Sequence, residues 1–375
     1  MEKREKTPAN KDLTQDQICD WLQLSLTPRI GPVTFFKLIE KHGTPEQALR
    51  ALQEPFGSKK GPPATPPPRN DIERLLDSLS KENIFCLPYA DSRYPKRLRD
   101  ISDPPPVLFA MGKISLLQQN CIAIVGARNA SITGKTIAKS FAKDLGELGH
   151  VIVSGLARGI DTSAHTGSLN TGTIAVLASG IDIPYPPENE ALHEMISEQG
   201  LLLSEVLPGT PPAAHLFPHR NRIISGLCSA VVVVEAAKKS GSLHTAQYAA
   251  DQGREVCAVP GSPLDPRCQG TNYLLKTGAT LVERASDIES ELRQYGENFY
   301  QKERIPSQKP TELPGKPASQ AHKTVLESIS YAPLGVDELV RQCQMSPEAV
   351  QQILLDLELS GKLERHPGNC VSLCA

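Results

Sequence analysis

The chain has 375 residues, with 40 Lys and Arg, 42 Asp and Glu, 9 Cys and 32 Pro. At about 100–200 residues per domain, this length predicts two or three domains. A hydrophobic content of 39% and a charged content of 22% are typical of an ordinary globular protein and exclude a disordered or fibrous one. With a net charge of −2, the chain lacks the excess of basic residues that many nucleic-acid binders have. Binding of nucleic acid would therefore need cations concentrated at one place.

The composition gives no sign of export or of membrane insertion. No run of about 18 apolar residues is present, and the first residues, MEKREKTPANKD, are charged where a secretory signal would be apolar. The nine cysteines are scattered and form no Cys-x-x-Cys pair, so neither a disulfide framework nor a zinc site is expected. We therefore expect a reduced, cytoplasmic protein with no membrane contact and no bound metal.

Two proline-rich stretches divide the chain. Residues 61–68 read GPPATPPP, and residues 306–317 read PSQKPTELPGKP. Neither can continue a helix or a central strand, so both are expected to be semi-rigid extended connectors. The expected segments are an N-terminal helical module over 1–85, a central domain over 86–300, a linker over 301–318 and a C-terminal domain over 319–375.

The N-terminal segment has the pattern of short helices over about 14–60. Leu22 and Leu26, and then Phe35 and Ile39, supply apolar helix faces, and the run RIGP at 29–32 supplies a turn. A helix, a glycine turn and a second helix resemble the helix-hairpin-helix and sterile-alpha-motif (SAM) modules. A single turn is a weak signal, however, and a helical cap packed on the central domain is about equally well supported.

The central segment alternates short apolar runs with helix-length amphipathic stretches. β-Branched runs of unbroken hydrophobicity, separated by such helices, predict a parallel sheet covered on both faces. This order predicts a doubly wound, Rossmann-like α/β domain, whose ligands bind at the carboxyl ends of the strands. The expected strands are 122–125, 151–153, 174–177, 201–203, 231–234, 256–259 and 280–282, and the expected helices are 131–147, 161–169, 188–198, 222–228, 243–251 and 272–276.

The C-terminal segment predicts a winged helix. Its expected elements are helices over 324–329, 336–343 and 347–359 and strands over 362–365 and 370–373. From residue 319 onward it has four Lys and Arg against seven Asp and Glu, and its third helix has no Lys or Arg. Because a helix in the major groove needs cations for the phosphates, we favour a protein-contact or structural role over DNA recognition.

Glycine and arginine follow the first two strands of the central domain. Glycine allows a tight turn, a helix N-terminus offers N–H groups to an anion, and a guanidinium matches phosphate oxygens. The Walker motif is excluded because Asn129 stands where GxxxxGK[ST] needs its first glycine, and GxGxxG is also absent. Asp161 is a plausible helix cap that the neighbouring His165 can reach, and a structural role for both is somewhat better supported than ligand contact. The residues expected at the site from these two loops are Gly126, Arg128, Ser154, Gly155, Arg158, Gly159 and Asp161.

Later strand ends add cations and hydroxyls at the same edge of the sheet. One of the two arginines in the run FPHRNRII is expected to pair instead with Glu205 or Glu235. Because the carboxyl ends of parallel strands meet at one edge, the combined loops predict a polyanion site of modest size. Neither a metal-ligand cluster nor a carboxylate pair with an assignable task is evident, so catalysis is not expected. The residues expected from these loops are Arg220, Asn221, Arg222, Lys238, Ser240, Gly241 and Ser242.

The runs at these strand ends resemble the DNA-processing protein A family (DprA, also called Smf). They lie in order between residues 121 and 282 and read VGARNAS, VSGLARGID, TIAVLASGID, FPHRNRIISGL, VVVVEAAKKSGSLHTAQYAADQGREVCAVPG and QGTNYLLKTGA. Each run alone is weak, but together they are specific. Two positions depart from the pattern: His244 replaces the usual isoleucine, and ASG at 178–180 replaces a more usual glycine-rich or cysteine-containing turn. Neither removes an anion-binding group.

The resemblance implies a function in handling single-stranded DNA. Family members bind single strands without sequence preference and load the RecA recombinase during natural transformation and recombination, as homodimers, with no cofactor and no enzymatic activity. By motif position, Arg128 and the 154–161 loop would hold phosphates, and the 220–222 and 240–242 segments would complete the groove. A flexible strand suits a small concavity that a rigid duplex cannot enter, with its bases available to aromatic or arginine faces.

Two other classes of function stay open. The SGLARGID and SGS loops loosely resemble nucleotide-cleaving phosphoribohydrolases, which need a PGGxGT-type turn and a nearby catalytic glutamate. The run PGSP at 260–263 and Glu235 match these features poorly. A sensor of small nucleotides is the third class. Cleavage of AMP would favour the enzyme, and tight mononucleotide binding without turnover would favour the sensor.

Overall fold

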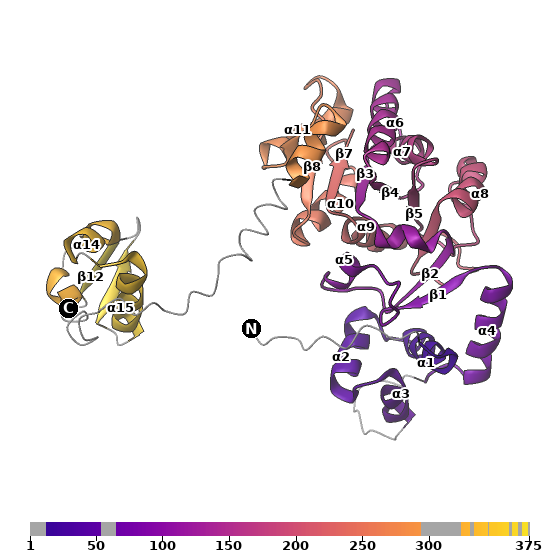
Figure 1. Ribbon diagram of the computed structural model, residues 1–375, viewed down its shortest axis with the longest axis horizontal. Coiled ribbons are helices and arrows are strands. Elements are labelled where there is room, and N and C mark those ends of the chain that lie inside the picture. Colours follow the sequence, from indigo (N-terminus) through magenta and orange to yellow (C-terminus); the bar gives the residue numbers. More distant parts are fainter. Residues whose placement is uncertain are drawn as a thin grey trace. The chain divides into compact units, whose positions relative to one another are not determined.

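The computed structural model describes residues 13–53, 65–293, 324–330, 334–343, 345–359, 362–366 and 370–373 (Figure 1). The chain divides into two compact units, Met1–Phe299 and Tyr300–Ala375, and each is considered by itself. The linker expected over 301–318 and residues 61–64 of the first proline-rich stretch lie outside the described residues.

A nine-stranded sheet forms the centre of the first unit, in the order β1-β2-β6-β5-β4-β3-β7-β8-β9. β2 pairs antiparallel with both β1 and β6, and all other neighbours are parallel. The seven strands from β3 to β9 match the predicted apolar runs to within one residue at each end. The strands are β1 (Phe85–Pro88), β2 (Val107–Gly112), β3 (Cys121–Val125), β4 (Val151–Ser154), β5 (Thr173–Val176), β6 (Leu201–Ser204), β7 (Ala230–Val233), β8 (Glu255–Ala258) and β9 (Thr280–Leu281).

Helices cover both faces of this sheet, which confirms the doubly wound α/β fold. α6 and α7 contact one another on one face (Figure 1). The helices of the central region are α5 (Lys96–Arg99), α6 (Ile132–Glu147), α7 (Ile160–Ser168), α8 (Glu190–Gln199), α9 (Leu216–Leu227), α10 (Gly241–Asp251) and α11 (Gln269–Lys276), with a further helix over 285–293. Short 3-10 helices lie at Ile114–Gln118, Pro187–Asn189 and Pro266–Cys268.

Successive side chains along a central strand pack into hydrophobic cores on opposite faces of the sheet. In β3, Ile122 and Ile124 pack in one core with side chains of α6 and α7, whereas Ala123 and Val125 pack in another with side chains of α9 and α10. Successive strand residues face opposite sides, so a strand covered on both faces must be apolar throughout. This is why the central strands are recognisable in the sequence as unbroken apolar runs.

The N-terminal helices pack against the antiparallel part of the sheet. They are α1 (Gln15–Ser25), α2 (Pro32–His42), α3 (Pro45–Gln53) and α4 (Arg69–Lys81). Trp21 shares a buried core with Phe109 of β2 and Leu202 of β6, and its ring stacks on Phe35 with the ring centroids 5.1 Å apart. The helical module therefore also caps the central sheet, and both belong to the same compact unit.

The second unit has the predicted winged-helix elements. α14 (Val336–Cys343) and α15 (Pro347–Leu359) follow a helical turn over 324–328, and β11 (Leu363–His366) pairs antiparallel with β12 (Cys370–Leu373). A strand that the sequence did not predict, β10 (Leu334–Gly335), pairs with the other side of β12. Within the parts of the chain that are described, no helix is both long and apolar enough to cross a membrane.

Candidate nucleic-acid interface

The carboxyl ends of β4, β3 and β7 are adjacent in the sheet, and a polar loop follows each strand. From β3 the chain proceeds through β4 and β5 to β6 in one direction, and from β7 it proceeds through β8 to β9 in the other. The point at which the strand order reverses therefore lies between β3 and β7. In open α/β sheets this reversal opens a crevice where ligands bind.

An open groove of about 490 Å³ lies over the loops that follow β3 and β4. Three of its residues, Arg128, Lys135 and Arg158, are exposed cations, and no described residue that lines it is acidic. We call it the basic groove, and its excess of positive charge fits a polyanion. Its lining residues are Arg128, Asn129, Lys135, Arg158, Gly159, Thr162, Ser163 and Asn189.

Aromatic rings lie beside this cationic surface. The Arg128 guanidinium carbon lies 5.2 Å from the centre of the Phe217 ring, and the Phe217 and Tyr185 ring centroids are 5.7 Å apart. Tyr185 is 40% exposed. Phe217 belongs to α9 and Tyr185 to the loop after β5, so neither is near Arg128 in sequence. Rings next to a phosphate-binding cation are suited to stacking with nucleic-acid bases.

Two of the predicted glycines bring the first two loops into contact. Gly159 has φ +81°, and a Cβ there would lie 2.3 Å from the Ala127 carbonyl oxygen. A Cβ at Gly126 would lie 2.6 Å from Cγ1 of Ile160. The Ile160 N–H donates to the Ala127 carbonyl at 3.3 Å. These glycines thus allow close packing of the loops that form the floor of the basic groove.

A buried charged cluster supports the loop after β4. The Asp161 carboxylate is 6% exposed and accepts the N–H groups of Gly155 at 3.1 Å and Ala157 at 3.4 Å. Arg220 is 5% exposed and donates to the carbonyls of Gly155, at 2.7 Å, and Val176. Burial raises the pKa of Asp161, and the charge of Arg220 opposes that rise. Burial lowers the pKa of Arg220 to about 10, which Asp161 opposes in turn.

Ser154 and Arg222 are buried as well. The Ser154 hydroxyl donates to the Ile124 carbonyl at 2.6 Å. Arg222 forms an ion pair with Glu205, and its Nε lies 3.2 Å from Oδ2 of Asp103. The expected pairing of one arginine with Glu205 therefore applies to Arg222. The side chains of Ser154, Asp161, Arg220 and Arg222 lie beneath the loop surface and shape it, whereas Arg128 and Arg158 lie on it.

His165, one turn into α7, is a structural residue of this cluster. Its Nδ1 lies 2.7 Å from the Thr173 hydroxyl, which itself donates to the Ile152 carbonyl, and its Nε2 accepts the Leu156 N–H at 3.3 Å. Nδ1 must therefore carry the proton and Nε2 the lone pair, so the ring is neutral. Burial, followed by the charge of Arg220, lowers the pKa of His165 to about 3.

We expect this histidine to make folding stability sensitive to acid. Because its pKa is lower in the folded chain than in the unfolded chain, the unfolded chain binds more protons below about pH 6.5. The free energy of unfolding should therefore fall by about 1.4 kcal/mol from pH 7.5 to pH 5.5 through this group alone. Chemical denaturation of the wild type and of His165→Gln at both pH values measures it. Equal pH-dependent losses in the two proteins would contradict the assignment.

The loop after β7 presents cations and hydroxyls at the start of α10. Lys238 and Gly241 are exposed, and the Ser240 hydroxyl caps the helix by accepting the Ser242 N–H at 3.4 Å. The Asn221 amide of α9 donates to the Gly241 carbonyl at 3.4 Å, which joins this loop to the helix that carries Phe217. Ser242 is 8% exposed. Lys239 is exposed beside Lys238, so this segment is a second cationic surface at the same sheet edge.

The loop that carries Arg128 is held by a buried carboxylate. Oε2 of Glu235 accepts the Ser131 N–H at 2.9 Å and Oε1 accepts the Ser131 hydroxyl at 2.5 Å. Glu235 is 6% exposed. Its carboxylate thus faces the α6 N-terminus and does not point out as a general base for a ligand in the groove. The enzyme alternative, which would use Glu235, has no support from this geometry.

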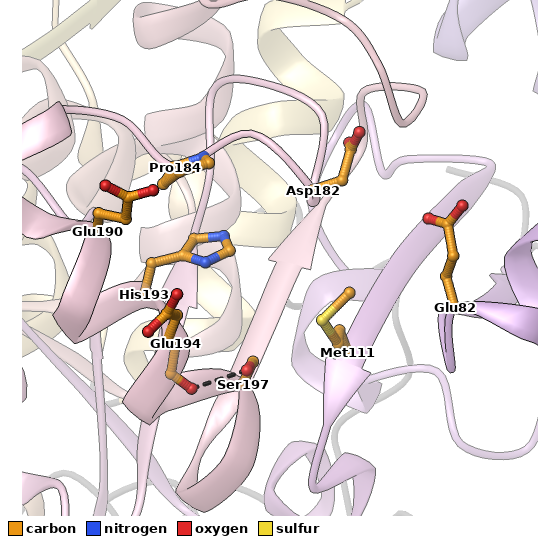
Figure 2. Close-up of a pocket in the computed structure, with 8 residues that line it drawn as sticks. All are labelled: Glu82, Met111, Asp182, Pro184, Glu190, His193, Glu194 and Ser197. Carbon is orange, nitrogen blue, oxygen red and sulfur yellow. Dashed lines mark hydrogen bonds between the residues drawn. The ribbon is translucent and has the colours of Figure 1, made fainter.

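A second groove of similar volume has the opposite charge. It lies beside α8 and β2, and Figure 2 shows Glu190, His193, Glu194 and Ser197 on one side and Glu82 on the other. Asp182 completes the acidic set, and no described residue that lines this groove is Lys or Arg. We call it the acidic groove. Because the two grooves have equal volumes of about 490 Å³, the sign of their charge decides which one suits a polyanion.

The described residues contain no group of three or more His, Cys, Asp or Glu side chains that could hold a metal ion. From the sequence we expect neither a metal nor a cofactor. The geometry of the basic groove requires neither for anion binding, because its exposed cations come from the side chains.

Sequence and structure comparisons place the chain among known proteins. Family models match three regions: a DprA-like N-terminal HHH domain over 15–77, DNA recombination-mediator protein A over 85–293 and a DprA winged helix domain over 309–369. The Smf protein of Escherichia coli K12 is 38% identical over 319 residues, which cover 82% of each chain.

Two solved structures are similar to the chain. The X-ray structure of DprA from Streptococcus pneumoniae matches with a TM-score of 0.62 and 35% identity, over 75% of this chain and 99% of that one. DprA from Helicobacter pylori, whose structure is described in terms of a unique single-stranded DNA binding mode, matches with a TM-score of 0.51 and 29% identity, over 57% and 96%. Because family models match its N-terminal helices, its doubly wound sheet and its winged helix, the chain belongs to the DNA processing protein A (DprA/Smf) family.

Proposed function

We propose that the chain binds single-stranded DNA without sequence preference in the basic groove. The observation that carries this proposal is the set of three exposed cations, Arg128, Lys135 and Arg158, in a groove without described acidic lining. The Phe217 ring beside Arg128 adds an aromatic surface on which a base can stack. The H. pylori relative, described by its single-stranded DNA binding mode, supports the same ligand class.

The shape of this surface favours a single strand over a duplex. Its cations come from two loops and one helix turn that surround an open concavity, so a flexible backbone can reach all three while a base lies against Phe217. Contacts to phosphates and to a ring face carry no sequence information. Binding through them is therefore independent of base sequence.

Charge also suggests the path of the strand. On the β5 side, no described residue that lines the acidic groove is Lys or Arg, so a phosphate finds no cation there. On the β7 side, Lys238 and the start of α10 attract them. We infer that the strand runs from the basic groove past Phe217 and Asn221 toward α10.

The predicted site residues divide into two groups under this proposal. One group contacts the strand, and the other, which is buried, holds the loops in place. The contact group is Arg128, Arg158, Asn221, Lys238, Ser240 and Gly241, and the supporting group is Ser154, Gly155, Asp161, Arg220, Arg222 and Ser242. The half-buried Gly126 and Gly159 let the two loops pack closely, and Gly159 also lines the groove.

The wider role that we propose is to load the RecA recombinase onto the bound strand during natural transformation and recombination, as a cytoplasmic homodimer without enzymatic activity. The match to a recombination-mediator family supports the role. Three cations give modest affinity, and a second groove on the same strand would raise it through effective concentration. The winged helix, whose third helix has no Lys or Arg, would serve protein contact or structure.

The test of the proposal is a titration of the purified chain into a labelled 20-mer single strand, followed by fluorescence anisotropy, with the matching duplex in parallel. We expect the single strand to bind more tightly. Its log affinity should fall with log salt with a slope between about −2 and −3, since each neutralised phosphate on a single strand contributes about −0.7 and the strand meets the three groove cations and Lys238. Equal binding of both forms, or a slope near zero, would contradict single-strand binding through these cations.

Glu188 should weaken this binding, because it pairs with a groove cation. Its Oε1 lies 3.4 Å from Nη1 of Arg158, and both side chains are about 60% exposed (61% and 59%). Glu188→Gln releases Arg158 for phosphate and should raise single-strand affinity about two- to fivefold at low salt. The gain should disappear at high salt, where exposed charges are screened. Glu194→Gln, in the acidic groove, is the matched control, and an equal gain there would refute a role for the Arg158 pair.

A further inference from the structure

We propose that Glu235 is a specificity-determining residue that excludes the terminal phosphate of a free mononucleotide from the point where the strand order reverses. The inference rests on the proposed function and adds to it the distinction between polymer and monomer. It starts from a property of the fold: the N-terminus of the helix after the first parallel strand offers backbone N–H groups and a favourable dipole to a phosphate.

In this chain that position is already occupied. α6 is 16 residues long and begins beside β7, and the Glu235 carboxylate takes both the N–H and the hydroxyl of Ser131. The Ser131 hydroxyl in turn accepts the Gly134 N–H at 2.8 Å. The Ser131 N–H is therefore directed at a carboxylate of the protein itself, and the Gly134 N–H is linked to the same carboxylate through the Ser131 hydroxyl.

The surrounding residues leave space for this carboxylate. A Cβ at Gly134, in the first turn of α6, would lie 2.5 Å from the Glu235 carboxyl carbon. A Cβ at Gly126 would lie 2.9 Å from the Glu235 carbonyl oxygen. Two glycines thus admit Glu235 at a place where larger residues would displace it. A carboxylate there has the charge and the acceptor oxygens of a bound phosphate, so a phosphate cannot enter at the same time.

The neighbouring loop is closed to a phosphate in the same way. The N–H groups of Gly155 and Ala157, in the loop that the resemblance assigns to phosphate binding, are directed at Asp161. Anion binding is thereby left to the exposed side chains of Arg128, Lys135 and Arg158. A polymer can contact several of these cations with successive phosphates, whereas a mononucleotide has one phosphate to offer. The internal carboxylates therefore favour a strand over the abundant free nucleotides of a cell.

Removing Glu235 should open the site to a single phosphate. The experiment measures binding of dAMP by isothermal titration calorimetry to the full-length wild type, Glu235→Ala, Glu235→Gln and the control Glu194→Ala. We expect dAMP affinity to rise at least tenfold in Glu235→Ala and by less in Glu235→Gln, which loses the charge but keeps most of the volume. Inorganic phosphate should compete with dAMP in Glu235→Ala. Glu194→Ala loses the same charge in the acidic groove and should behave as the wild type.

The outcomes separate this inference from the proposed function. A folded Glu235→Ala that binds dAMP no better than the wild type would overturn the inference, as would an equal gain in Glu194→Ala. If Glu235→Ala does not fold, Glu235→Gln decides in the same way, since its amide oxygen can still accept the Ser131 N–H while the negative charge that repels a phosphate is gone. Anisotropy with the 20-mer is run on each variant. Absence of single-strand binding in the wild type would refute the proposed function, whatever the dAMP result.

Discussion

Replacing Arg128 and Arg158 together by alanine should weaken single-strand binding about 100-fold. Both side chains are exposed in the basic groove, and hydrogen bonds to charged groups contribute about 1.5–3 kcal/mol, so each loss corresponds to at least about tenfold. The salt slope should become shallower by about 1.4, because two phosphates are no longer neutralised. Anisotropy with the 20-mer over a series of salt concentrations measures both quantities.

A matched control distinguishes loss of contact from loss of charge. Arg50→Ala/Arg74→Ala also removes two exposed arginines, each paired with a nearby carboxylate, from α3 and α4. Affinity and slope should stay close to the wild type in this control. If both double variants weaken binding equally, the overall charge of the chain matters and the basic groove is not the site.

Replacing Arg220 by methionine should destabilise the first unit by about 3–5 kcal/mol, the typical cost of breaking a buried charge pair on one side. Arg220 and Asp161 are each at least nine-tenths buried, and each is the principal opposite charge acting on the other. The variant leaves the Asp161 carboxylate without a counter-charge and the Gly155 carbonyl without its donor. Chemical denaturation measures the loss.

A double-mutant cycle tests whether the two residues act as a pair. Asp161→Asn combined with Arg220→Met should cost clearly less than the sum of the single changes, because neither charge is then left alone. Arg74→Met, at an arginine that is 77% exposed, is the control and should change stability little. Additive losses in the cycle would show that the buried charges do not support one another.

The parallel strands could be predicted because their burial on two faces makes them continuously apolar. β1 and β2 were not predicted, because FCLP and VLFAMG lie among prolines at 88, 95 and 104–106, which are typical of loops. Their place in the sheet depends on pairing between β2 and β6, which are far apart in sequence. Pairing of that kind leaves no local pattern.

The predicted start of α9 at 222 was wrong, because the helix begins at Leu216. Pro218 lies in the first turn of this helix, where proline is tolerated because its missing N–H has no intrahelical partner. The earlier start places Arg220 and Arg222 inside the helix, and both are buried there. The sequence places them at a helix start, which suggests exposure.

The sequence predicts the polar loops at the sheet edge better than it predicts which of their side chains are exposed. Arg128 and Arg220 each stand beside an asparagine in a polar loop-like run, yet one is exposed and the other buried, because only Arg220 meets the carbonyls of Gly155 and Val176. Those partners are 65 and 44 residues away. Distant partners of this kind cannot be inferred from one sequence.

Two groove residues were missed for different reasons. Lys135 belongs to the run GKT, which is not part of a Walker motif in this sequence. Its ammonium group nevertheless lines the basic groove. Phe217 precedes a proline in an arginine-rich run, and its contact with Arg128 joins residues 89 positions apart. An aromatic beside an arginine-rich run is the signal that could have pointed to it.

Photo-crosslinking of a single strand that carries 4-thiothymidine tests the central claim most directly. The full-length chain is bound to the labelled strand, irradiated and digested, and the modified peptides are identified by mass spectrometry. We predict cross-links in the peptides that contain Phe217, Tyr185 or Arg128, and their loss in Arg128→Ala/Arg158→Ala. Cross-links confined to α1–α4 or to the winged helix would place the strand elsewhere and contradict binding in the basic groove.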